Sequence, residues 1–203
     1  IDAQVHLKGV SLAHLHPFLR STLPGSPAYE FRSRIRHTRE GTSFAEVRGT
    51  IGRSDLAGEL SVVRGQHRPM VRATLHSASA RLTDFLPLRP GAGTGKPGGK
   101  PSPAHRQDAP QGFTGERLEA LDARIEFEAT RFNAAPLPLL EDVRFTADLA
   151  DGVLNMKPFE LRMAGGRIAG ALSLDDRQEA PLAHARLDLQ NLQLERLLES
   201  LDK

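Results

Sequence analysis

The chain has 203 residues and a formal net charge of +2, with 39% hydrophobic, 26% charged and 5% aromatic residues. It contains no cysteine, which excludes a disulfide scaffold, thiol catalysis and cysteine-based zinc sites. No apolar run is long enough for a transmembrane helix, and the dispersed charges and scarce aromatic residues argue against a nucleic-acid partner.

Alternation of apolar and polar residues dominates the chain from its first residues. Ala3, Val5 and Leu7 begin the alternation, and 29–36 continues it, with Tyr29 and Phe31 alternating with charged residues. A period of two places successive side chains on opposite faces of a β-strand. Because the pattern is already running at the start, we expect the chain to be a fragment of a longer protein.

The segment from Arg89 to Thr114 interrupts the alternation. It is rich in Gly, Pro and Ala and offers no aliphatic residues to bury, which predicts a disordered loop. Within it, Gly93–Gly98 matches a phosphate-binding glycine pattern by letter, but Pro97 prevents the helix that such a loop needs. We therefore divide the chain into a β-repeat segment 1–88, a Gly/Pro-rich loop 89–114 and a β-repeat segment 115–203 that ends in a short helix.

The alternation resumes after the loop, over 121–129, 143–149 and 159–163. Asp151-Gly152 and Gly165-Gly166 provide turn residues between these strands. The predicted fold is all-β with minor α. We expect a repetitive, curved antiparallel sheet that forms a groove or half-open barrel, with short amphipathic helices after Val10, Ala80 and Leu192.

An internal repeat supports this prediction. LAGELSV, starting at Leu56, matches IAGALSL, starting at Ile168, and the match continues without a gap at a constant shift of 112 residues. A partial third copy opens the chain, where Ala3, Val5 and Leu7 align with positions 73–77. Each copy ends in a strand followed by apolar residues at helical spacing.

The histidines and carboxylates of the chain do not form a recognisable catalytic or metal-binding motif. His14 and His16 lie two residues apart, a spacing at which side chains on a helix do not face each other. His6 is nearby, but no carboxylate motif accompanies these histidines. The pairs Asp175-Asp176 and Glu141-Asp142 lie at predicted turns, where adjacent side chains point apart. We predict no catalytic residue, no metal site and no cofactor, and we expect the protein not to be an enzyme.

Two longer patterns resemble the AsmA-like family of bacterial envelope proteins. One is VRGTIGRSDLAGELSV from Val47 onward, and the other is FELRMAGGRIAGALSLDD from Phe159 onward, with Gly58 and Gly170 at the central glycine. The resemblance covers nearly the whole chain outside the 89–114 loop. It implies a bridge-like lipid carrier with a periplasmic β-groove, whose parent protein is anchored in the inner membrane.

The same resemblance implies a phospholipid or another acyl-chain lipid as partner, and further envelope proteins as additional partners. Membrane contact would come only through parts of the parent protein that this chain lacks. We expect the groove to be lined by apolar strand residues: Phe31, Ile35, Phe44, Ile51, Leu60, Leu75, Ile125, Phe127, Val143, Phe145, Leu161, Ile168, Leu172 and Leu187.

The strand pattern leaves an alternative open. The same apolar face would serve equally as the closed core of a β-sandwich, which would make the protein a periplasmic interaction scaffold. What fills the apolar face distinguishes the two hypotheses: acyl chains in a carrier, side chains in a scaffold. The sequence does not identify the lipid species, the direction of transfer or the oligomeric state.

Overall fold

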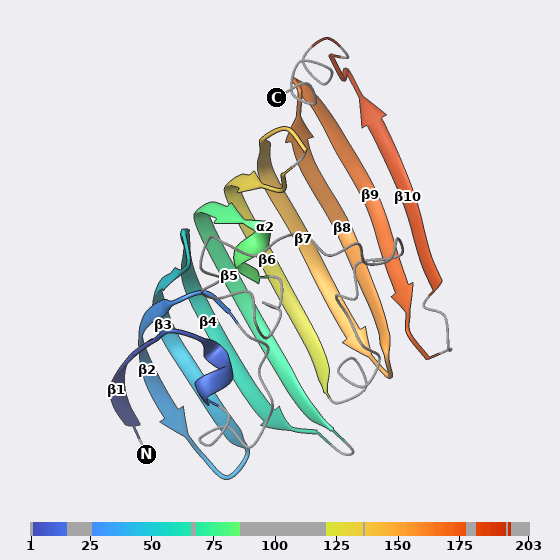
Figure 1. Ribbon diagram of the computed structural model, residues 1–203. Coiled ribbons are helices and arrows are strands. Elements are labelled where there is room, and N and C mark those ends of the chain that lie inside the picture. Colours follow the sequence, from blue (N-terminus) through green and yellow to red (C-terminus); the bar gives the residue numbers. More distant parts are fainter. Residues whose placement is uncertain are drawn as a thin grey trace, which may run out of the picture.

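The structure is a computed structural model that describes residues 2–15, 26–65, 68–85, 121–135, 137–177, 182–193 and 195. Ten strands form one sheet, in which the spatial order of the strands is their order along the chain. Figure 1 shows them side by side in a twisted, curved sheet, with the two short helices in front of it in this view.

The first half of the sheet consists of β1 (Asp2–Gly9), β2 (Tyr29–His37), β3 (Gly41–Ile51), β4 (Ser54–Arg64) and β5 (Pro69–Arg81). The second half consists of β6 (Asp122–Asn133), β7 (Leu140–Ala150), β8 (Val153–Met163), β9 (Gly166–Asp175) and β10 (Leu182–Gln190). A 3-10 helix, η1 (Leu12–Leu15), follows β1, and a short α-helix, α2 (Leu82–Phe85), follows β5.

The predicted all-β, curved sheet is confirmed, and β1 and β10 are its two edges because the sheet does not close on itself. The pairing is mostly antiparallel, as expected: β5 and β6 are parallel, and every other neighbouring pair is antiparallel. Parallel neighbours need a connection that returns along the sheet. A period-two pattern carries no information about strand direction and cannot show this.

The short helices expected after Val10 and Ala80 are present as η1 and α2. The helix expected after Leu192 and the loop Arg89–Thr114 fall on residues outside the described part of the chain. The division into segments 1–88, 89–114 and 115–203 therefore stays a prediction. In the described residues, the sheet runs without interruption from the first segment into the last.

The strand registers repeat with the shift seen in the sequence. Phe44 pairs with Leu60 across β3 and β4, and Met156 pairs with Leu172 across β8 and β9, each residue 112 positions further along. The registers of β4–β5 and β9–β10 correspond in the same way. Strands β2–β5 thus correspond to β7–β10, and β1 and β6 are the strands that precede each set.

Turns and bulges give the sheet its local geometry. Asp151 and Gly152 both have positive φ, 51° and 75°, as a two-residue hairpin turn requires. The second predicted turn lies one residue earlier than expected, at Ala164-Gly165, because these are the two positive-φ residues and Gly166 already begins β9. Register shifts in β3, β7 and β8 mark β-bulges, which bend strands and increase twist.

The buried core lies on one side of the second half of the sheet. Its main cluster comes from β5–β9 and includes Phe127, Val143, Leu161 and Ile168, with Ala80 only 1% exposed. A smaller cluster forms around Ala123 and Leu149 near the opposite ends of β6 and β7. Side chains from several strands reach each cluster, so packing ties the second half together across the sheet.

Candidate functional site

All fourteen predicted groove residues lie on one face of the sheet, which we call the inner face. Cross-strand partners share a face, and the registers link Ile35 to Phe44, Phe44 to Leu60 and Leu60 onward through β5 to Ile125. The series continues through β7, β8 and β9 to Leu187 on β10. The registers therefore place all fourteen residues on a single face. Strict period-two alternation would separate Phe44 from Ile51, and the bulge in β3 returns them to the same face. That this face is a lipid groove stays a prediction.

The opposite face, called the outer face, carries the charged side chains of the strands. Arg144 Nε lies 2.7 Å from Glu128 Oε1 on the neighbouring strand, one of several cross-strand ion pairs. Hydrogen bonds from His6 and Lys8 lower the pKa of Glu30 below its ordinary value. Exposed pairs of this kind contribute at most about 1 kcal/mol each, so they hydrate the outer face more than they stabilise the sheet.

The inner face is not equally covered along its length. Five of the candidates are buried: Ile51, Phe127, Val143, Leu161 and Ile168. Leu187 on the edge strand β10 is 45% exposed. The remaining eight are half-buried: Phe31, Ile35, Phe44, Leu60, Leu75, Ile125, Phe145 and Leu172. Half-buried apolar rows thus lie on both sides of a packed centre.

Helix α2 covers the packed centre. Its residue Phe85 contacts the ring of Phe127 edge-on at a centroid distance of 6.4 Å, and Phe145 stacks on Phe127 at 5.2 Å. Phe132 meets the same ring edge-on at 6.3 Å. Such aromatic pairs add about 0.5–1.5 kcal/mol beyond the burial of their area. The inner face at Phe127 is therefore filled by side chains rather than open.

A buried carboxylate fixes α2 to the sheet. Asp84 in α2 accepts hydrogen bonds from the Ser54 hydroxyl at 2.7 Å and from the Arg53 backbone N–H at 2.9 Å. Ser54 is fully buried and also accepts a hydrogen bond from the Arg81 N–H. Gly52, at φ +59°, leaves room for the Asp84 carboxylate, since a Cβ there would lie 2.5 Å from its Oδ1.

A second carboxylate bonds to the backbone near the end of β5, beyond its last residue paired with β4, His76. Asp55 on β4 accepts hydrogen bonds from the backbone N–H groups of Ala78 and Ser79, at 2.9 and 2.7 Å. Burial raises the pKa of Asp55, but these hydrogen bonds and one from the Ser77 hydroxyl outweigh it, so the pKa lies below its ordinary value. The carboxylate thus accepts from N–H groups that lie beyond the end of the β4–β5 pairing.

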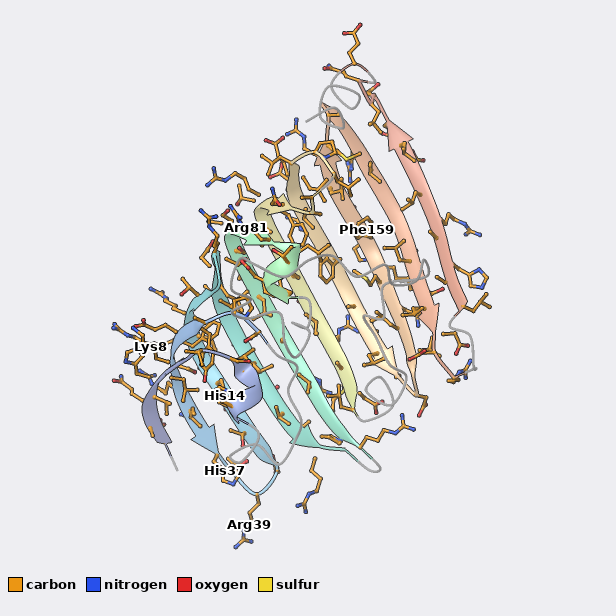
Figure 2. All side chains as sticks on the ribbon, in the orientation of Figure 1. Lys8, His14, His37, Arg39, Arg81 and Phe159 are labelled. Carbon is orange, nitrogen blue, oxygen red and sulfur yellow. The ribbon has the colours of Figure 1, made fainter. Side chains whose placement is uncertain are left out.

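A basic hollow lies at one end of the sheet, where the β2–β3 and β4–β5 hairpins turn. It has a volume of about 580 Å³, and His37, Arg39, Arg64 and Arg68 are among its lining residues. Figure 2 shows His37 and Arg39 at this end of the sheet. This hollow was not predicted from the sequence, although one signal for it is present: the apolar row of β4 ends in Arg64.

Another hollow, of about 590 Å³, lies on the outer face between β3 and β6. Opposite charges line it, with Arg72 and Arg124 beside Glu59 and Glu126. Arg124 is already engaged with Asp148 at 3.3 Å and with Glu126 at 3.8 Å. Mixed and partly paired charges give this hollow no preference for an ion of one sign.

The absence of a metal site and of a catalytic site stays a prediction. Among the described residues, no group of three or more His, Asp or Glu side chains is arranged to hold a metal ion. Hydrogen bonds from the Arg177 side chain and backbone lower the pKa of Asp175 to about 2, which makes Asp175 an ion-pair partner. His14 belongs to η1, whereas His16 lies outside the described residues.

None of the described helices has the length and hydrophobicity of a membrane span.

Comparison with known proteins gives a consistent result. The model of the AsmA family matches residues 28–203 of the chain. A curated relative, AsmA family protein YhjG from Escherichia coli (strain K12), is 25% identical over 224 aligned residues, which cover 100% of this chain and 32% of the relative. The chain thus spans about a third of the length of that relative. No solved structure matches the chain.

Proposed function

The chain belongs to the AsmA family, and from this membership and its one-sided sheet we propose that it is a non-enzymatic module of envelope biogenesis that binds lipid acyl chains on its inner face. The observation that carries the proposal is the apolar row across β2–β4, where Ile35, Phe44 and Leu60 lie side by side and are only half-buried. Each acyl CH₂ buried on such a row would contribute about 0.8 kcal/mol.

The proposal places the chain in the periplasm as part of a longer protein anchored in the inner membrane. Its partner would be a phospholipid or another acyl-chain lipid that moves between the membranes, and membrane contact would come from other parts of the parent protein. In the described part of the chain, β1 and β10 have a strand on one side only, which supports this arrangement, since edge strands are normally paired or protected.

The test uses two neighbouring residues of β4 that point to opposite faces. We expect the full chain, purified from a bacterial host, to carry phospholipid that native mass spectrometry and lipid extraction detect. Leu60→Asp places a charge on the inner face and should remove the lipid. Ser61→Asp adds the same charge to the outer face, opposite Arg72, and should retain it. A folded wild-type chain without lipid, or a folded Leu60→Asp chain with undiminished lipid, would refute the proposal.

The packed centre at Phe127 favours a second candidate, the interaction scaffold with a closed core. In that function, the inner face is covered by side chains, and a protein strand adds to a free edge of the sheet. The same experiment separates the two candidates. A lipid-free, folded and monomeric chain would favour the scaffold.

A further inference from the structure

The apolar rows of the first half of the sheet end in basic residues at the hairpin end. On β4, Leu60 and Val62 are followed on the same face by Arg64, and on β2, Ile35 is followed by His37. Residues two apart along a strand are separated by about 6.6 Å. A molecule that lies on the apolar row would therefore present its next group to these two side chains.

Basic residues outnumber acidic residues in the lining of the hollow at this end. His37, Arg39, Arg64 and Arg68 line it, and Glu40 is the only acidic residue among its lining residues. Arg68 Nη1 is buried and has no hydrogen-bond partner among the described residues, although Asp151 Oδ1 lies 3.3 Å away. A guanidinium carries five N–H donors, so the ion pair with Asp151 leaves donors of Arg68 for a further acceptor. An anion with several acceptor oxygens would engage them.

The second half of the sheet shows that the hairpin geometry does not demand these charges. At the positions 112 residues further along, Leu149 stands for His37 and Asp176 stands for Arg64. Leu149 is 9% exposed and packs in the smaller core cluster, and Asp176 is a buried carboxylate. Among the described residues, the corresponding end of the second half therefore carries an apolar side chain and a carboxylate where the first half has His37 and Arg64.

We propose that the basic hollow binds the phosphate of a lipid headgroup with net negative charge, while the acyl chains of the same lipid lie on the apolar row of β2–β4. The proposal rests on the proposed function and adds the substrate class to it. Arginine suits this role because its planar fork donates two parallel hydrogen bonds to phosphate oxygens. The position of Arg64, at the end of the row that Leu60 begins, would join headgroup recognition to acyl binding.

The experiment measures headgroup preference apart from total lipid. The full chain is equilibrated with vesicles of phosphatidylglycerol and phosphatidylcholine in equal amounts and with identical acyl chains, and bound lipids are counted by native mass spectrometry. We expect wild type to prefer phosphatidylglycerol by about fivefold or more. Arg64→Gln/Arg68→Gln should bring the ratio near one through loss of bound phosphatidylglycerol. The control Arg72→Gln/Arg186→Gln removes the same charge from the outer face and should keep the preference.

The outcomes are distinguishable. No bound lipid in folded wild type would refute the proposed function itself. Bound lipid without preference, or a preference that survives in Arg64→Gln/Arg68→Gln, would overturn the headgroup site and leave lipid binding intact. A parallel arm replaces vesicles with inorganic phosphate. Stabilisation of wild type by phosphate alone, together with no preference among lipids, would assign the hollow to free phosphate and would also overturn the proposal. Circular dichroism confirms that each variant is folded.

Discussion

Removal of the Asp84 carboxylate should detach α2 from the β3–β4 turn. Asp84→Ala leaves the Arg53 N–H and the fully buried Ser54 hydroxyl without their acceptor. Hydrogen bonds to charged groups contribute about 1.5–3 kcal/mol each, and relief from burying a charge offsets part of this, so we expect a loss of about 2–4 kcal/mol in the free energy of unfolding. Urea unfolding at neutral pH, followed by circular dichroism, measures the loss.

A double-mutant cycle tests the reason for this loss. Ser54→Ala removes the same hydrogen bond from its other side, so the double variant with Asp84→Ala should lose less than the sum of the single losses. Asp188→Ala on the exposed edge strand β10 is the control and should change stability by no more than about 0.5 kcal/mol. The reasoning is refuted if Asp84→Ala matches this control or if the two single losses add without coupling.

Two further predictions concern the inner face and the end of β5. Phe127→Ala should destabilise the chain by about 3–5 kcal/mol in urea unfolding, because Phe127 is only 6% exposed. Phe44→Ala, at a half-buried site, should lower the free energy of unfolding clearly less. Equal losses would contradict the packed centre. Asp55 has a lowered pKa, so its stabilising contribution is present above its ordinary value of 3.8 and disappears as the pH falls through the lower folded-state value. Asp55→Asn should therefore lower stability at neutral pH and flatten the decline in acid, and an unchanged acid profile in unfolding experiments would contradict this.

The sequence was sufficient to assign residues to faces. Ile125, Phe127 and Phe145 were expected on one face because side chains alternate strictly along a regular strand, and the registers place them there. The 112-residue shift likewise follows from the letters around Gly58 and Gly170, and it recurs in the strand pairing. The first feature depends only on the period of each strand and the second only on the repeat, and both can be read from the sequence.

Bulges, strand direction and long-range hydrogen bonds were not accessible in the same way. Glu46 and Asp142 adopt positive φ and shift the register by one residue. Neither residue is a glycine, so the sequence contains no sign of a positive φ at these positions. The hydrogen bond between Ser54 and Asp84 joins residues 30 positions apart, with no motif that links them. Such contacts depend on where two segments meet, and the period of a single segment does not contain that information.

The sequence by itself determined that this protein is a β-sheet with one apolar and one charged face, because the alternation of residue types fixes the two faces of every strand. Only the tertiary structure decided which part of the apolar face is filled and which part is available. Phe127 and Phe44 are both aromatic residues in strands, and the sequence does not distinguish them. In the structure, Phe85 of α2 packs over Phe127, whereas Phe44 stays half-buried. The physical reason is that burial depends on the neighbours a residue acquires on folding, and those neighbours come from distant parts of the chain.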